Sequence, residues 1–245
     1  MFEDYEKYSF ESTLRNGHAA YHDVYAWGTG PSLMVMHELS GLEKKTRVLA
    51  EKLIGDGFRV HLPHILGPLG RKATAANTVR ALCLRKEFSL FSKHQSSPIV
   101  DWLGALTAEI QRRDETDQVG VIGMCLTGNF ALVLLARDGV AAAVASQPSL
   151  SFSAPWADKS AIHMSPEEVA DAKAAMASKG KALALRFSDD RISPKPKMEK
   201  IVKLFEPHID TESFAGPHHS LLTYDFRQEA YDLVLSHLRD RMWIS

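Results

Sequence analysis

The chain contains few cysteines: of its 245 residues only two, Cys83 and Cys125, carry a thiol. Two cysteines do not provide the framework of several disulfides that holds small secreted domains together. They fit a reducing compartment, where thiols stay free and remain available for chemistry. We therefore expect a cytoplasmic protein whose fold depends on a hydrophobic core rather than on covalent cross-links.

The chain also lacks an excess of charge of either sign and any long hydrophobic run. Its 29 Lys and Arg residues nearly balance 30 Asp and Glu residues, which gives a formal net charge of -1. Because no basic stretch stands out, binding to nucleic acid is not expected. No apolar run approaches the roughly 20 residues that span a bilayer, and the acidic start is unlike a signal peptide, so no membrane partner is expected.

The histidines lack the spacing of a metal site. His37 precedes Glu38, but the zinc-binding helix motif requires a second His at the position that Gly41 occupies. His218 and His219 are adjacent in an expected loop, which is poor spacing for two ligands of one metal. We therefore expect no metal and no other cofactor.

What the chain does contain is a regular alternation of short apolar runs and longer amphipathic segments. The short runs have the length of strands, and the longer ones have the periodicity of helices. Strand, helix and strand in succession imply parallel pairing, and hence an α/β fold with a doubly wound, mostly parallel sheet and helices on both faces, in a single domain over 1–245. We expect strands at 21–27, 32–36, 58–62, 119–122, 139–146, 182–187 and 210–214, and helices at 43–55, 72–91, 99–113, 129–136, 166–178, 194–205 and 221–241.

The most informative stretch is 117–137, in which an expected strand leads through a short turn into an expected helix. The turn reads Gly-Met-Cys-Leu-Thr-Gly and has Cys125 at its centre. Many hydrolases have a Ser at this place, on a sharp turn that exposes the nucleophile. Gly123 and Thr127 are small, as such a turn requires. The following helix N-terminus would favour the thiolate, although a buried, inert Cys fits this motif alone equally well.

Reactive side chains follow three other expected strands as well. In chain order, the residues at the strand ends are Glu38, Cys125, the pair Asp189 and Asp190, and the pair His218 and His219. The carboxyl ends of parallel strands meet at one edge of the sheet, where sites in such folds form. Nucleophile, acid and base follow one another in the order of the α/β-hydrolases, which favours a hydrolase over an inert core cysteine.

From about Ser32 onward the chain resembles the dienelactone hydrolase family, and three motifs carry the resemblance. They are E-L-S-G-L at 38–42, G-M-C-L-T-G at 123–128, and D-R-I-S-P at 190–194 together with H-S at 219–220. The corresponding family segments are Glu-x-x-Gly-Val/Leu, Gly-Tyr-Cys-Leu-Gly-Gly, and Asp-x-x-x-Pro with His-Ser. The resemblance implies an α/β-hydrolase fold over nearly the whole chain.

The resemblance also implies a set of site residues. Asp190 is preferred to Asp189 because Pro lies four residues after it, and His219 is preferred to His218 because Ser follows it. The implied residues are the catalytic triad of Cys125, His219 and Asp190, an oxyanion hole made by the backbone N–H groups of Leu126 and Leu39, and Glu38 as an additional carboxylate that takes part in activating the thiol.

The sequence departs from the family at positions that contact the substrate. Four residues after the catalytic His the family has a substrate-binding Arg, and this chain has Thr223. Another substrate-binding Arg of the family lies on the helix that corresponds to 72–91, where Arg80, Arg85 and Lys86 are the candidates. Because a Thr hydroxyl carries no charge, we expect neutral esters or lactones to be preferred over carboxylated ones.

Together these observations predict a cysteine hydrolase that acts on a lactone or carboxylic ester through an acyl-enzyme. The alternative is a non-catalytic or redox-sensing member of the fold, with Cys125 as an oxidisable thiolate. Asp190 and His219 favour hydrolysis, because a sensor needs only an acidic thiol. The irregular segment 147–164 either covers the site or is a plain surface loop. The expected partner is a small-molecule substrate, and the expected assembly is a monomer or homodimer.

Overall fold

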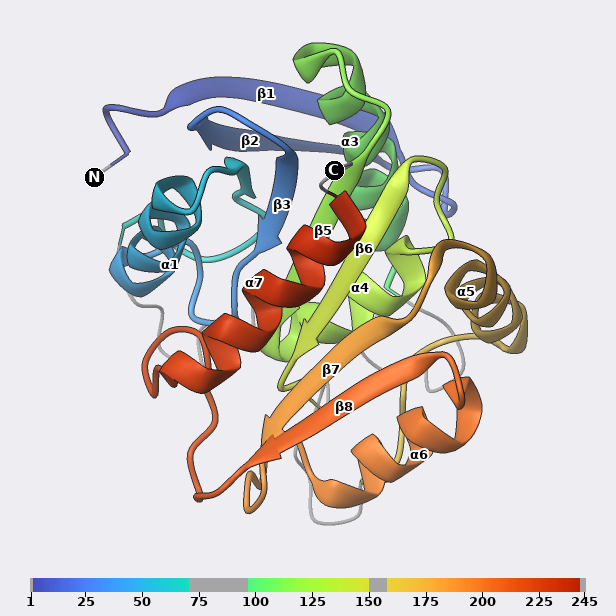
Figure 1. Ribbon diagram of the computed structural model, residues 1–245. Helices are drawn as coiled ribbons and strands as arrows, with labels where there is room; N and C mark the ends of the chain where they lie inside the picture. Colours follow the sequence, from blue (N-terminus) through green and yellow to red (C-terminus); the bar gives the residue numbers. More distant parts are fainter. Residues whose placement is uncertain (1, 71–96, 150–157, 243–245) are drawn as a thin grey trace.

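The computed structural model describes residues 2–70, 97–149 and 158–242. These residues form one eight-stranded sheet flanked by helices (Figure 1). The strands are β1 (Glu6–Thr13), β2 (Ala19–Trp27), β3 (Ser32–Met36), β4 (Arg59–Pro63), β5 (Val119–Met124), β6 (Val140–Ser146), β7 (Ala182–Phe187) and β8 (Ile209–Phe214). The helices are α1 (Lys44–Gly55), α3 (Ile99–Asp114), α4 (Gly128–Leu134), α5 (Pro166–Lys179), α6 (Lys195–Phe205) and α7 (Gln228–Met242), with a 3₁₀ turn η1 (Cys125–Thr127).

The order of the strands places two of the candidate residues side by side. The strands lie in the order β1-β2-β4-β3-β5-β6-β7-β8. The pairs β1–β2 and β2–β4 are antiparallel, and all pairs from β4 to β8 are parallel. The chain reverses its direction of progress across the sheet at β3 and β5, which is where ligands bind in open α/β sheets. Met36 at the end of β3 pairs with Gly123 of β5, so Glu38 and Cys125 leave neighbouring strands at the same edge.

Both faces of the central sheet are buried, which explains why its strands are continuously apolar. Alternate side chains of β3 enter opposite cores, as the two-residue period of a strand requires. Leu33 and Val35 pack with residues of α1 and α7, whereas Met34 and Met36 pack with residues of α3 and α4. Figure 1 shows α1 and α7 in front of the sheet and α3 and α4 behind it. The doubly wound α/β-hydrolase architecture predicted from the sequence is therefore confirmed.

Two elements differ from the prediction. β1 was not expected, because it is an edge strand that buries only Tyr8 and has no apolar run. The last helix begins at Gln228 rather than at 221, because residues 221–225 form turns; the buried Leu221 and Leu222 had extended the apolar pattern of the helix toward its N-terminus. Among the helices that the structure describes, none is long and apolar enough to cross a bilayer.

Candidate active site

The turn at 123–128 carries the candidate nucleophile Cys125 and is called the nucleophile turn; it has the sharp geometry that its sequence indicates. Cys125 follows β5 directly and has a φ of 58°, in the left-handed region that non-glycine residues adopt only where the surrounding structure enforces it. A side chain at Gly123 would come within 2.1 Å of the carbonyl oxygen of Thr127, so only glycine fits there. α4 begins at Gly128, after the 3₁₀ turn, rather than directly after the nucleophile.

Thr127 takes the place of a family glycine, and its hydroxyl group has a structural role. Its oxygen accepts a hydrogen bond from the N–H of Met124 at 2.8 Å. Its hydrogen lies within reach of the carbonyl oxygens of Met124 and Met36, at 2.9 and 3.1 Å. The side chain is buried. Thr127 therefore ties the nucleophile turn to the end of β3, where Glu38 leaves the sheet.

The structure pairs His219 with Asp190, although they are far apart in the sequence. Nδ1 of His219 donates to Oδ2 of Asp190 at 2.7 Å. The other carboxylate oxygen accepts the N–H groups of Ile192 at 2.8 Å and Ser193 at 3.0 Å. Burial by itself would raise the pKa of Asp190, but the hydrogen bonds from His219 and these amides outweigh it and lower the pKa. The acid is thus held ionised and in a fixed orientation.

The neighbours of this pair in the sequence point elsewhere. Asp189 is exposed and accepts a hydrogen bond from the Ser188 hydroxyl at 2.8 Å. The side chain of His218 is 51% exposed and faces Asp225, with Nδ1 3.4 Å from a carboxylate oxygen. The geometry therefore separates the two candidates in each adjacent pair.

The imidazole of His219 lies between the carboxylate of Asp190 and the thiol of Cys125. Its Nε2 is buried and has no hydrogen-bond partner of regular geometry among the described residues. Burial would lower the pKa of His219, but the hydrogen bond to Asp190 and the interaction with Cys125 raise it to about 10. The side chain of Cys125 is itself only 7% exposed. The imidazole of His219 is therefore placed between a carboxylate and the thiol of Cys125, with which it interacts.

Glu38 is buried and surrounded by neutral donors. Its Oε1 accepts the Gln147 side-chain amide at 3.0 Å and the Thr223 hydroxyl at 2.7 Å. Its Oε2 accepts the Ser220 hydroxyl at 3.0 Å. Burial raises the pKa of Glu38, partly offset by these hydrogen bonds and by the charge of His219. The Thr223 hydroxyl is thus directed to Glu38, from a turn that precedes α7.

The two amide groups expected to form an oxyanion hole come from the same two strand ends. Leu126 follows the nucleophile and Leu39 follows Glu38. No described residue accepts a hydrogen bond from the N–H of Leu39. The N–H of Leu126 lies in the first turn of a helical segment, where amides have no intrahelical acceptor. The role predicted for these two amides in an oxyanion hole stays a prediction.

Two supporting residues were not found from the sequence. Oδ2 of Asp225 accepts the N–H groups of His219 and Ser220, at 3.2 and 3.1 Å, and fixes the loop that carries the imidazole. Arg186 is buried and donates to the carbonyl oxygens of Ser193 at 2.8 Å and Asp190 at 3.2 Å. The sequence could have indicated Arg186, because an arginine inside an apolar strand such as β7 needs buried hydrogen-bond partners. It could not have indicated Asp225, which is one acidic residue among several in a polar loop.

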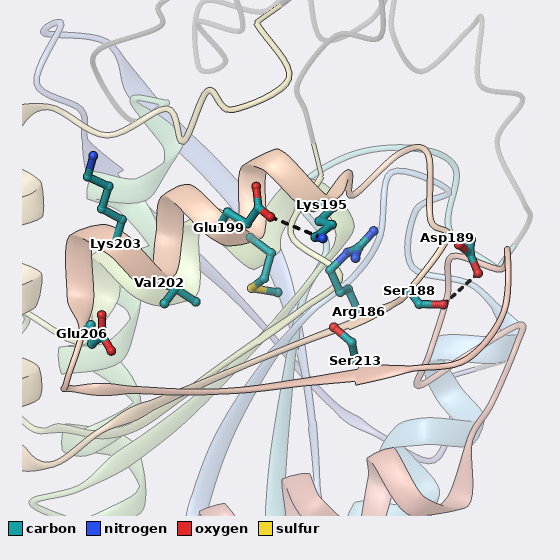
Figure 2. Close-up of a pocket in the computed structure, with 10 residues that line it drawn as sticks. Arg186, Ser188, Asp189, Lys195, Glu199, Val202, Lys203, Glu206 and Ser213 are labelled. Carbon is teal, nitrogen blue, oxygen red and sulfur yellow. Dashed lines mark hydrogen bonds and ion pairs between the residues drawn. The ribbon is translucent and has the colours of Figure 1, made fainter.

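Arg186 also lies beside a groove between α6 and β8 (Figure 2), with a volume of about 690 Å³. Asp189 and Lys195 are among its lining residues, whereas Cys125 and His219 are not. Burial lowers the pKa of Arg186, against the nearby charges of Asp190 and Asp189. The groove therefore adjoins the turn that carries the acid without being part of the nucleophile's surroundings.

Several candidates lie outside the described residues, namely the predicted helix 72–91 with Arg80, Cys83, Arg85 and Lys86, and the part of the predicted loop at 150–157. The roles predicted for Arg80 and Arg85 in binding substrate therefore stay predictions. Among the residues that are described, no group of three or more His, Cys, Asp or Glu side chains could hold a metal ion.

The sheet order, the nucleophile turn and the strand-end residues together define an α/β-hydrolase. The sequence pattern of the dienelactone hydrolase family matches residues 19–232. The chain therefore belongs to the dienelactone hydrolase family and is a carboxylic ester hydrolase, as the motifs predicted. A search of curated proteins finds no match to the chain.

Solved structures share the fold at low sequence identity. A dienelactone hydrolase-like promiscuous phosphotriesterase from metagenomic libraries is 14% identical, with 97% of this chain and 99% of that chain covered and a TM-score of 0.64. A candidate dienelactone hydrolase from Klebsiella pneumoniae is 14% identical, with coverage of 97% and 98% and a TM-score of 0.63. The esterase Pf2001 of Pyrococcus furiosus is 13% identical, with coverage of 98% and 92% and a TM-score of 0.63.

Proposed function

We propose that the protein hydrolyses neutral lactones or carboxylic esters through a thioester formed on Cys125, within one α/β-hydrolase domain spanning 1–245. The observation that carries the proposal is the hydrogen-bonded pair of His219 and Asp190 beside a cysteine in a strained turn. A redox sensor needs only a reactive thiolate, so this pair supports hydrolysis. The esterases among the solved structures of the same fold agree with the ester class.

Acylation begins with transfer of the thiol proton of Cys125 to Nε2 of His219. The thiolate attacks the ester carbonyl carbon, and the carbonyl oxygen becomes an oxyanion that accepts the N–H groups of Leu126 and Leu39. One such donor contributes roughly 3–4 kcal/mol in the transition state. As the carbon–oxygen bond to the leaving group breaks, His219 gives its proton to the departing alkoxide. For a lactone the alcohol stays attached to the acyl group.

Deacylation uses the same groups in reverse. Nε2 of His219 accepts a proton from water, and the water oxygen forms a bond to the thioester carbon. The carbon–sulfur bond then breaks with the sulfur leaving as a thiolate, and the proton on Nε2 either passes to the sulfur or stays on the imidazolium beside it. Asp190 holds Nδ1–H, so Nε2 has its lone pair available in both half-reactions. The net reaction is ester plus water to acid plus alcohol.

Glu38 acts in this scheme through its charge. Both its oxygens accept hydrogen bonds from Gln147, Ser220 and Thr223, and its charge interacts with His219. A carboxylate held near the imidazolium stabilises the ion pair between His219 and Cys125. Glu38 therefore helps to control the thiol proton without having to contact the sulfur.

The surroundings of Thr223 support a preference for neutral substrates. Its hydroxyl lies 2.7 Å from Oε1 of Glu38, and no Lys or Arg of the described residues is hydrogen-bonded to that carboxylate. A substrate carboxylate placed near Thr223 would meet the charge of Glu38, which His219 already balances, and no Lys or Arg bonded to Glu38 among the described residues would offset the second negative charge. Losing a charge-assisted contact to a buried carboxylate costs roughly 2–5 kcal/mol. We expect kcat/KM to be higher for a neutral ester than for its carboxylated analogue.

Alkylation tests the assignment of the nucleophile. Iodoacetamide should label Cys125 well before Cys83 and abolish hydrolysis of an activated ester such as p-nitrophenyl acetate. Cys125→Ala should be inactive, and Cys83→Ala is the matched control that should keep wild-type turnover and lose activity to iodoacetamide at the wild-type rate. Loss of activity with label confined to Cys83 would overturn the proposal.

A further inference from the structure

The hydroxyl group of Ser149 lies against the thiol of the candidate nucleophile, Cys125. With the thiol protonated, Sγ of Cys125 donates to Oγ of Ser149 at 3.4 Å. Both side chains are buried, Ser149 to 2% exposure. Ser149 lies in the segment 147–164, which the sequence left open as a cover of the site or a plain surface loop, and Ser149 itself was not among the predicted site residues.

The hydroxyl is held in place by the backbone of Ser149. Its N–H donates to the carbonyl oxygen of Cys125 at 3.0 Å, and its carbonyl oxygen accepts the side-chain amide of Asn129 at 2.9 Å. The chain reaches this position through Gln147, which has a φ of 36° in the left-handed region and whose N–H donates to Leu185. These bonds fix Ser149 to the same turn that holds the sulfur.

The approach of this segment to the nucleophile turn is close. A side chain at Gly128 would meet the Cα of Pro148 at 3.0 Å and the carbonyl oxygen of Ser146 at 3.1 Å. The Ser193 hydroxyl donates to the carbonyl oxygen of Pro148 at 2.9 Å, which joins the segment to the turn that carries the acid. Ser149 therefore cannot move away from Cys125 without disturbing several bonds.

We propose that Ser149 is a second hydrogen-bond partner of the nucleophile, donating its hydroxyl hydrogen to the Cys125 thiolate; this inference rests on the proposal that Cys125 is the nucleophile. A thiolate has no hydrogen to give, so in the charged state only the hydroxyl can be the donor. A hydrogen bond made to the charged form favours that form. Ser149 thus shares with His219 the task of stabilising and directing the thiolate when it forms.

The same hydrogen bond makes the thiolate less reactive once it has formed. The nucleophilicity of thiolates rises with their basicity, with a Brønsted coefficient of about 0.4–0.5. Removing the donor should therefore have two opposite effects on alkylation. Fewer molecules carry the thiolate at a given pH, but each thiolate reacts faster. A residue that only supports the loop would not produce this combination.

The experiment measures the rate of iodoacetamide alkylation at Cys125 against pH, with the labelled peptide quantified by mass spectrometry. In Ser149→Ala the midpoint of the profile should rise by about one pH unit, a tenfold change in the ratio of thiolate to thiol. The plateau rate at high pH should increase about threefold. Ser149→Thr keeps the hydroxyl and should restore the wild-type midpoint.

Ser32→Ala is the matched control, because it also removes a buried, hydrogen-bonded serine hydroxyl, here one that donates to Asp114 at the start of β3, and leaves the sulfur and its neighbours untouched. Its midpoint and plateau should equal those of wild type. The titratable groups around the sulfur among the described residues are His219 and, behind it, Asp190 and Glu38; no variant changes them. Circular dichroism at each pH checks that every variant is folded.

A Ser149→Ala profile identical to that of wild type would overturn the inference, and so would an equal shift in Ser32→Ala. The test does not use ester turnover. If Ser149→Ala shows the shifts but wild type hydrolyses no ester, the proposed function fails while the role of Ser149 stands. If wild type hydrolyses esters and the profile does not move, the proposed function stands and the role of Ser149 fails.

Discussion

Replacing Asp190 by Asn tests the pairing at the centre of the site, because it removes a charge and keeps the shape of the side chain. The Asn oxygen can still accept the N–H groups of Ile192 and Ser193, which now bond to Oδ1. In wild type the carboxylate of Asp190 accepts the hydrogen bond from Nδ1–H of His219. The amide group of Asn would instead donate a hydrogen to Nδ1. The imidazole must then carry its hydrogen on Nε2, and it cannot take the proton of Cys125.

The size of the loss follows from a comparison of nucleophiles. In a serine enzyme the same change lowers kcat about 10⁴-fold. A thiol is several pKa units more acidic than an alcohol and depends less on its base, so we expect a loss of about 10²–10³-fold, equivalent to about 3–4 kcal/mol of activation free energy. KM should change little, because neither the oxyanion amides nor the surroundings of Thr223 are altered.

Steady-state hydrolysis of p-nitrophenyl acetate measures this loss, and Asp189→Asn is the matched control. Asp189 is exposed and bonded only to Ser188 among the side chains described, so its replacement should leave kcat within about twofold of wild type, as surface changes usually do. The reasoning would be refuted if Asp190→Asn retained wild-type kcat, or if Asp189→Asn were the more damaging change.

Further predictions concern charge and burial. In Glu38→Gln a negative charge near His219 is lost, so the alkaline limb of kcat against pH should move to lower pH with unchanged folding; an unchanged profile with altered thermal stability would make Glu38 purely structural. A carboxylated dienelactone should be hydrolysed with lower kcat/KM than its methyl ester, and the reverse order would show that a cation outside the described residues binds the carboxylate. Burial lowers the pKa of Lys197 from 10.5 to about 7, so the unfolded chain binds the proton more tightly, and stability rises with pH between these values. Lys197→Met should therefore raise the melting temperature more at pH 6 than at pH 10. Lys200→Met, at an exposed position on the same helix, should leave the melting temperature unchanged at both pH values.

The parts of the molecule that the sequence predicted are those with a local signal. Continuous apolar runs marked the buried strands, and small residues around Cys125 marked the sharp turn that its φ of 58° now explains. The strand ends also indicated which chemistry-bearing residues would meet, because parallel strands bring their carboxyl ends to one edge. Which residue of each adjacent pair would face inward came only from the family motifs, since nothing local distinguishes Asp189 from Asp190.

The parts that escaped prediction depend on contacts between distant segments. Ser149 meets Cys125 because the chain bends at Gln147 and crosses over Gly128, and no local pattern predicts that bend. Thr223 was read as facing the substrate on a helix, but it lies in a turn and donates to Glu38. β1 has too few buried residues to show an apolar run, since it is an edge strand.

The most direct test of the account is to identify the residue that carries the acyl group during turnover. Wild type is mixed with p-nitrophenyl acetate, quenched in acid within the first turnover and digested, and the acetylated peptide is located by mass spectrometry. We predict acetyl on Cys125, a burst of p-nitrophenol equal to the enzyme concentration, and neither signal in Cys125→Ala. Acetyl on another side chain such as Ser149, or undiminished turnover by Cys125→Ala, would contradict the central claim that this enzyme works through a thioester at Cys125.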